Sequence, residues 1–379
     1  MADRKLFSAE DHRRAAQRRM PRIIFDALDG GAGRETALRK NTEAFDDLFL
    51  QSRVLVNVQD RSLQTTFLDT PWQLPFGISP MGMCNLFWPD ADQILAEAAR
   101  TLGFPLGVST MASTSLEEIF EQAGGNAWFQ LYAGESDEVT FGLVERAERA
   151  GYSALILTAD VPVLPSRPRD YRNGFAVPFK MTPRHVFDFA WHPRWSLGTL
   201  ARGVPKPVNI SEHTALKRLP EFKRESGRDR IDWAFLRELR AMWKGDLILK
   251  GVMSPEDAKM GIAAGVDAVY VSNHGGRQLE SAPPAIQALP IIREAIGPSA
   301  PLVFDSGVRS GDDVVCALAS GADFVMLGRP MLYAIAGSGR AGLDTFLNVL
   351  MDDVSIVMAQ IGCRSPAEVG ANCLVGTCG

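Results

Sequence analysis

The chain has 379 residues, of which 46% are hydrophobic and 22% are charged, and its formal net charge is −5. This composition excludes a disordered or collagen-like chain, and the acidic balance argues against a nucleic-acid-binding protein. The five cysteines form no CxxC pair, so neither a disulfide framework nor a zinc site is indicated and no metal is expected.

Short helices are expected over residues 1–60, without the apolar core segment of a signal peptide. Residues 61–75 (RSLQTTFLDTPWQLP) are typical of a β-hairpin that would close the bottom of a barrel. No run of 18 apolar residues occurs, so no segment is expected to span a bilayer. A cytoplasmic protein, or one bound peripherally to the inner face of the membrane, is therefore expected.

From residue 75 onward, short apolar runs alternate with amphipathic stretches that end in Gly or Pro. Such alternation indicates parallel strands covered by helices, and its repetition favours a closed (β/α)8 TIM barrel over an open sheet. A single domain over 1–379 is expected, with N-terminal helices and hairpin (1–74), the barrel (75–379) and an insertion after strand 4 (161–230). The predicted strands are 75–81, 105–110, 127–132, 154–160, 246–252, 268–273, 301–307 and 324–329.

Polar side chains stand at the ends of nearly all of these predicted strands. In a barrel of this kind, the strand ends converge on the C-terminal face, where active sites are built. One polar strand end carries little information, but the repetition indicates an enzyme. The residues concerned are Ser109, Gln130, Tyr132, Thr158, Asp160, Lys250, Ser272, His274, Asp305 and Arg329.

The segment SNHGGRQLE (272–280) is the most informative one for chemistry. His274 follows a strand between polar and glycine neighbours, and an imidazole that titrates near neutral pH suits a general base. Arg277 could clamp a carboxylate through paired hydrogen bonds. Asp160, at the end of strand 4, could orient the imidazole and stabilise its protonated form.

Lys250 stands near the end of strand 5 after three apolar residues. The residue pattern alone leaves two roles open for it. It could form a Schiff base, or it could be a cation that stabilises an anionic cofactor.

Two segments are candidate phosphate sites. GSGRAG (337–342) matches the dinucleotide-binding pattern but is preceded by a predicted helix rather than by a strand, so a phosphate role is rejected there. The loops after strands 7 and 8 are better placed, since Gly307 and Gly328 allow close backbone approach while Arg309 and Arg329 supply charge.

The motifs FQLY, LTAD, LILKGV, SNHGGRQLE, DSGVRSGDD and LGRP, in this order, resemble those of the FMN-dependent 2-hydroxy acid dehydrogenase/oxidase family. The resemblance extends over nearly the whole chain. It implies that an L-2-hydroxy acid is oxidised to the 2-keto acid while FMN is reduced, with oxygen or a quinone as the electron acceptor. A homo-oligomer, most commonly a tetramer, is also implied.

The resemblance assigns roles residue by residue. His274 corresponds to the catalytic base, Asp160 to its carboxylate partner and Tyr132 to the active-site tyrosine, while Arg277 and Arg167 bind the substrate carboxylate. Lys250 would lie at the N1–C2=O edge of the flavin. The other residues implied in FMN binding are Pro80, Gly82, Ser109, Gln130, Thr158, Ser272, Asp305, Gly307, Arg309, Gly328 and Arg329.

Two positions depart from the family pattern. Ala27 stands where the family usually has a substrate-binding tyrosine, so a hydrogen bond is lost and the pocket gains room. This favours a larger or aromatic, mandelate-like substrate, with L-lactate as the alternative. Ser306 replaces a common glycine in a turn, where we expect it to be tolerated.

The insertion carries Phe187, Phe189, Trp191 and Trp195 among basic residues over 184–206. Aromatic and basic side chains together suit a peripheral membrane contact, and this segment resembles that of membrane-associated members of the family. A lid or an oligomer-packing loop is an equally acceptable interpretation.

Three other functions are less consistent with these residues. Another FMN-barrel oxidation, acting on a substrate that is not a hydroxy acid, should lack the Arg167/Arg277 pair. A Schiff-base aldolase built on Lys250 would contain no flavin. A barrel that only binds ligands is disfavoured, since base, partner and both arginines are present.

Overall fold

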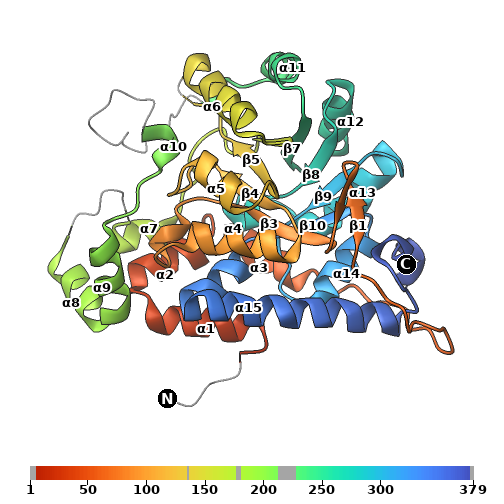
Figure 1. Ribbon diagram of the computed structural model, residues 1–379, viewed down its shortest axis with the longest axis horizontal. Coiled ribbons are helices and arrows are strands. Elements are labelled where there is room, and N and C mark those ends of the chain that lie inside the picture. Colours follow the sequence, from red (N-terminus) through yellow and green to blue (C-terminus); the bar gives the residue numbers. More distant parts are fainter. Residues whose placement is uncertain (1–5, 135, 176–180, 212–227, 376–379) are drawn as a thin grey trace.

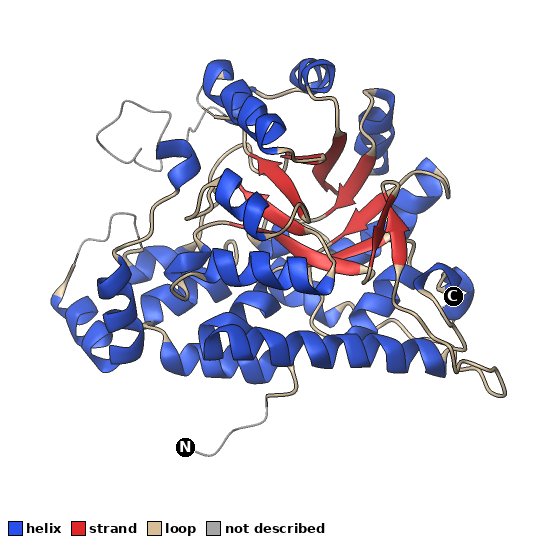
Figure 2. Cartoon of the chain, in the orientation of Figure 1, coloured by secondary structure: helices blue, strands red, loops and turns tan. Residues whose placement is uncertain are grey.

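The alternation of strands and helices closes into a barrel of eight parallel strands in the order β10-β3-β4-β5-β6-β7-β8-β9 (Figures 1 and 2). The computed structural model describes residues 6–134, 136–175, 181–211 and 228–375. The (β/α)8 prediction is confirmed. The barrel strands are β3 (Phe76–Met81), β4 (Leu106–Ser109), β5 (Ala127–Leu131), β6 (Ala154–Thr158), β7 (Asp246–Val252), β8 (Ala268–Val271), β9 (Leu302–Phe304) and β10 (Phe324–Leu327).

The strands are buried on both faces, which explains their nearly continuous apolar sequence. Every residue of β5 and β6 is buried, because one face points into the barrel and the other lies under helices. Several strands end before the predicted boundary. Arg329, for example, was predicted at the end of a strand but begins a helix, because strand pairing stops at Leu327 and the chain turns at Gly328.

The predicted hairpin is present as β1 (Thr65–Phe67) and β2 (Thr70–Trp72). Phe67 and Trp72 pack against Trp128 and Phe324 in the core cluster formed by the interior of the barrel. The hairpin therefore closes this end of the barrel with aromatic side chains and leaves the opposite, C-terminal end for a site.

Helices cover the outside of the barrel, and serine caps begin several of them. The side chains of Ser115, Ser136, Ser254 and Ser310 each accept a backbone N–H of the first helical turn that follows. These covering helices are α4 (Ala91–Leu102), α5 (Leu116–Gln122), α6 (Asp137–Ala150), α11 (Trp233–Met242), α12 (Pro255–Ala263), α13 (Ala285–Ile296), α14 (Gly311–Ala319) and α15 (Arg329–Gln360).

Between residue 6, where the described chain begins, and the barrel lie three helices: α1 (Ala9–Arg19), α2 (Arg22–Asp29) and α3 (Thr36–Glu43). Helix α1 lies along α15 (Figure 1). The segment GSGRAG lies inside α15, at a kink where Ser338 and Gly339 leave helical geometry. The segment is thus preceded by helix rather than by a strand, as the sequence predicted.

The insertion contains helices α7 (Pro168–Asn173), α8 (Pro183–Trp191), α9 (Pro193–Arg202) and α10 (Val208–Ser211). Residues 176–180 and 212–227 of the predicted insertion lie outside the described residues. Helices α8 and α9 project from one end of the molecule (Figure 1). In the described part of the chain, no helix is both long and apolar enough to cross a membrane.

Candidate active site

A cavity of about 330 Å³ opens at the C-terminal ends of the barrel strands. All the predicted site residues except Asp160 and Ser272 line it, and these two are hydrogen-bonded to residues that do. The lining residues that had been predicted are Ala27, Pro80, Gly82, Ser109, Gln130, Tyr132, Thr158, Arg167, Lys250, His274, Arg277, Asp305, Gly307, Arg309, Gly328 and Arg329.

His274 follows β8 and is oriented by Asp160. Its Nδ1 atom lies 3.0 and 3.2 Å from the two carboxylate oxygens of Asp160, and its Nε2 atom lies 3.4 Å from the phenolic oxygen of Tyr132. A carboxylate only accepts hydrogen bonds, so Nδ1 carries the proton and Nε2 of the neutral ring is free to accept one. The backbone of His274 has φ +57°, a left-handed conformation uncommon outside glycine and typical of functional sites.

The imidazole is suited to act as a base. Burial lowers the pKa of His274 below its ordinary value of 6.5, and Asp160 opposes this shift. The ring is therefore neutral near pH 7, with a carboxylate in place to stabilise the imidazolium. Burial raises the pKa of Tyr132 to about 12, with Asp160 adding to the shift, so its phenol stays protonated.

Arg277 and Arg167 place two guanidinium groups on the cavity. Arg277 donates to the carbonyl oxygen of Gly30 at 2.6 Å, at the end of α2, and Arg167 donates to the carbonyl oxygen of Arg277 at 3.4 Å. Burial, followed by repulsion from Arg167, lowers the pKa of Arg277 to about 9. An anion bound between them would relieve this repulsion, as a substrate carboxylate would.

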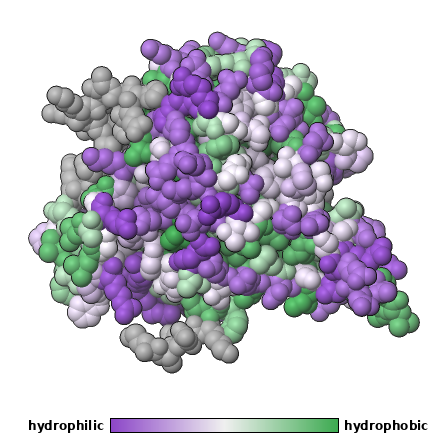
Figure 3. Space-filling model, viewed as in Figure 1, coloured by the Kyte–Doolittle hydropathy of each residue, from purple (hydrophilic) through white to green (hydrophobic). Residues whose placement is uncertain are grey.

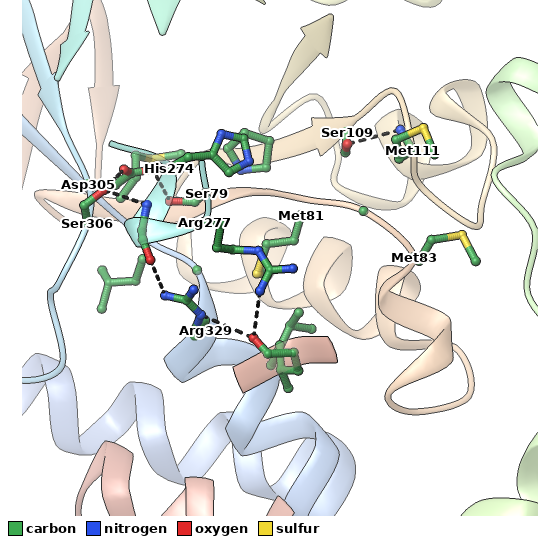
Figure 4. A pocket seen from close by; sticks show the side chains of 18 of the residues that line it. Ser79, Met81, Met83, Ser109, Met111, His274, Arg277, Asp305, Ser306 and Arg329 are labelled. Atoms are coloured by element: carbon green, nitrogen blue, oxygen red, sulfur yellow. Dashed lines mark hydrogen bonds between the residues drawn. The ribbon is translucent and has the colours of Figure 1, made fainter. Parts of the chain in front are cut away.

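A second basic region is formed by the loops after β9 and β10. Arg329 donates to the carbonyl oxygens of Gly275 and Gly30 at 2.9 and 3.2 Å, and Arg309 lines the same cavity. Figure 4 shows Arg329 and Arg277 directed toward the same backbone segment. Gly307 has φ +103°, and a Cβ atom there would lie 2.2 Å from the carbonyl oxygen of Asn41, so only glycine fits.

Lys250 lies on the barrel side of the cavity. Its ammonium donates to the hydroxyl of Ser272 at 2.7 Å and lies 3.3 Å from the carboxylate of Asp305. Although burial favours the neutral acid, Lys250 and the neighbouring hydroxyl donors hold the pKa of the Asp305 carboxyl below its usual range. Lys250 is therefore held between Ser272 and Asp305, which suits a fixed cation better than a Schiff-base nucleophile.

The cavity fits a flavin nucleotide. Nε2 of Gln130 and Oγ1 of Thr158 are buried on its lining and have no hydrogen-bond partner among the residues that the structure describes. Buried polar atoms are rarely left unpaired, so these two atoms are suited to hydrogen-bond a polar ligand such as the pyrimidine edge of a flavin. The basic region around Arg309 and Arg329 and the start of α15 suits the phosphate of the same molecule.

Four polar residues of the site escaped the sequence analysis. Tyr270 and Ser79 donate to Asp305 at 2.9 and 3.2 Å, and Asp170 lines the cavity beside the two arginines. Arg228 stacks on the ring of Tyr132, 4.5 Å from its centroid. Ser79 and Tyr270 are polar residues in apolar strands, a signal that could have been followed. Arg228 lies in the insertion, where no periodicity places it.

Comparison with known proteins agrees with the site. The profile of the FMN-dependent dehydrogenase family matches residues 16–376, and the chain belongs to this family. It is 38% identical to (S)-mandelate dehydrogenase of Pseudomonas putida over 361 residues, which cover 94% of this chain and 91% of the relative. It is 36% identical to L-lactate dehydrogenase of Xanthobacter autotrophicus over 373 residues, covering 97% and 96%.

The fold agrees with solved structures at similar identity. The crystal structure of the monotopic membrane protein (S)-mandelate dehydrogenase superposes with a TM-score of 0.93 at 36% identity, covering 99% of this chain and all of the other. The protein is thus an FMN-dependent oxidoreductase, as the sequence predicted.

Proposed function

We propose that this protein oxidises an L-2-hydroxy acid to the 2-keto acid, with His274 as the base. The observation that carries the proposal is that His274, held by Asp160, faces the same cavity as Arg277 and Arg167. A base beside two guanidinium groups suits an anionic substrate with a hydroxyl next to its carboxylate. The named activities of the mandelate and lactate dehydrogenase relatives support this substrate class.

When bound, FMN accepts the two electrons that the substrate loses. The protein residues have distinct tasks around it. Arg277 and Arg167 bind and orient the carboxylate of the substrate. Nε2 of His274 accepts the proton that the substrate loses, and Asp160 stabilises the resulting imidazolium. The residues that would hold FMN are Pro80, Gly82, Ser109, Gln130, Thr158, Lys250, Ser272, Asp305, Gly307, Arg309, Gly328 and Arg329.

We propose further that the substrate carries a large or aromatic substituent, mandelate-like. Ala27 lines the cavity, one residue before Leu28, whose carbonyl oxygen lies 3.5 Å from the Arg277 guanidinium. The methyl group of Ala27 leaves space close to the arginine that binds the carboxylate. Apolar side chains on the same lining, among them Leu86, Phe87 and Phe175, suit a hydrocarbon substituent.

The projecting helices α8 and α9 are proposed as a peripheral membrane contact on the cytoplasmic side. Phe187, Trp191, Leu197 and Leu200 are exposed by 69%, 74%, 66% and 78%, and basic residues lie among them. Figure 3 shows hydrophobic surface at this end of the molecule. A soluble domain rarely exposes so many large apolar side chains together. The description of the mandelate dehydrogenase neighbour as monotopic supports the proposal.

A homotetramer of this one-domain chain is proposed from the family resemblance alone, and light scattering of the FMN-loaded protein would test it.

A substrate screen tests the function. The FMN-loaded protein is mixed without oxygen with (S)-mandelate, (S)-phenyllactate, L-lactate and glycolate, and the loss of oxidised-flavin absorbance is followed. Bleaching by at least one of these acids is expected, fastest with an aromatic one, and bleaching by none of them would overturn the proposal. Turnover with oxygen, compared with a quinone analogue, then identifies the acceptor.

A further inference from the structure

The backbone around His274 is held by hydrogen bonds to two serine hydroxyls. Oγ of Ser272 accepts the N–H of His274 at 3.0 Å. Oγ of Ser306 accepts the N–H groups on either side, from Asn273 at 3.3 Å and from Gly275 at 3.0 Å. Three consecutive N–H groups of the loop after β8 are therefore bound to side chains rather than to water.

The same two hydroxyls bind one carboxylate oxygen. Ser272 and Ser306 both donate their hydroxyl hydrogen to Oδ1 of Asp305, the latter at 2.9 Å. The remaining lone pair of Ser272 accepts from Lys250. A hydroxyl has one hydrogen and two lone pairs, so the hydrogen-bonding capacity of both groups is used fully. Their orientations are fixed, and Figure 4 shows Asp305, Ser306 and His274 grouped together.

Ser306 keeps its side chain at a strained position. Its φ is +89°, in the region that favours glycine, and Gly307 follows at φ +103°. A serine in this conformation is costlier than a glycine. Unlike glycine, serine supplies a hydroxyl at this position, and this hydroxyl binds the loop of His274. The sequence predicted a tolerated turn residue and could not show this contact, which joins residues 31 positions apart.

We propose that Ser306 is a positioning residue for the catalytic base: its hydroxyl holds the loop 273–275 so that the imidazole stays on Asp160 and directed into the cavity. This inference rests on the proposed role of His274. The charged and titratable groups that face the imidazole are Asp160, Lys250, Arg167 and Tyr132. Of these, Asp160 is the one that favours the protonated ring, so a loosened loop weakens that support.

Two substitutions distinguish the effect of the Ser306 hydroxyl from the effect of the strained backbone. Ser306→Ala removes the hydroxyl and keeps the Cβ atom, whereas Ser306→Gly removes both and relieves the backbone. Ser320→Ala is the matched control, since Ser320 is buried at the far end of α14 and does not line the cavity. Each FMN-loaded variant is measured for FMN affinity, KM, the limiting rate of flavin reduction and the pKa of His274 by NMR, assigned with His274→Ala.

In both Ser306 variants the limiting rate of flavin reduction should fall by about 10-fold or more, because a small misplacement of a catalytic group lowers the rate strongly. KM and FMN affinity should stay within about twofold of wild type. The pKa of His274 should change in both, because its burial and its contact with Asp160 both depend on the position of the loop, and Ser320→Ala should match wild type. An unchanged limiting rate and an unchanged His274 pKa in both would overturn the proposal. So would a defect confined to FMN affinity. If wild type itself is not reduced by any 2-hydroxy acid, the proposed function fails instead, and the NMR result still decides whether Ser306 positions the ring.

Discussion

Nδ1 of His274 lies 3.0 Å from Oδ1 of Asp160, although the two residues follow strands β8 and β6, which are separated in the barrel by β7. Gly251 of β7 makes this contact feasible. It has φ +100°, and a Cβ atom there would lie 2.5 Å from Cβ of Asp160. The orienting carboxylate thus reaches the imidazole across an intervening strand at the one residue type that leaves room for it.

Asp160→Asn should slow flavin reduction by about 100-fold or more with little change in FMN affinity, because the amide does not stabilise the imidazolium. In wild type, the rate should fall as His274 becomes protonated, with the acid limb below 6.5 because the folded-state pKa is lowered. In the variant, the acid limb should move still lower, because the group that raises this pKa is lost. Stopped-flow reduction across pH checks both. A near-normal rate, or an unmoved acid limb, would remove Asp160 from the site.

Arg277→Lys should raise KM for the hydroxy acid about 10- to 100-fold, since an ammonium does not form the paired hydrogen bonds of a guanidinium. FMN affinity should change little. Arg309→Gln is the converse control, expected to weaken FMN binding while leaving KM of the FMN-saturated enzyme near normal. If Arg277→Lys leaves KM and kcat unchanged, the carboxylate binds elsewhere.

Ala27→Tyr should shift substrate preference toward small acids, because the phenol adds a hydrogen-bond donor and fills the space beside Arg277. We expect wild type to prefer an aromatic or long-chain 2-hydroxy acid over L-lactate by about 10-fold in kcat/KM, which corresponds to ~1.4 kcal/mol. The variant should reduce or reverse this ratio. A wild-type preference for lactate that the substitution does not change would show that position 27 does not shape the pocket.

The double variant Phe187→Ser/Trp191→Ser should bind vesicles containing phosphatidylglycerol more weakly than wild type, with unchanged dye-linked activity. The control is Ile291→Ser, a comparably exposed apolar position on α13, exposed by 56%. Co-sedimentation provides the measurement. Equal sedimentation of all three proteins would favour the lid or packing interpretation of the insertion.

The fold was predictable because the strands of a closed parallel barrel are apolar throughout and the chain repeats one βα unit. The site residues were predictable for a related reason: a barrel brings its strand ends together, so polar strand ends such as Lys250 and His274 must meet. The exact ends of strands were less predictable. Arg329 lies in a helix because hydrogen-bonding between strands, which sequence does not show, ends at Leu327.

The contacts between distant segments could not be predicted from periodicity. Asp305 was expected only as a cofactor contact, yet it accepts hydrogen bonds from Ser272, Ser306 and Tyr270. Arg228 reaches Tyr132 from the insertion, which has no repeating register to fix its position. These contacts depend on side-chain directions, which follow only from the folded backbone.

The most direct test of the account is the reduction of FMN-loaded His274→Ala by the best substrate, followed by stopped flow without oxygen. The variant should retain FMN, since the imidazole is not among the groups proposed to hold it, and should lose at least about 100-fold in the limiting rate of flavin reduction. A variant that binds FMN normally and is reduced at nearly the wild-type rate would contradict the assignment of His274 as the base.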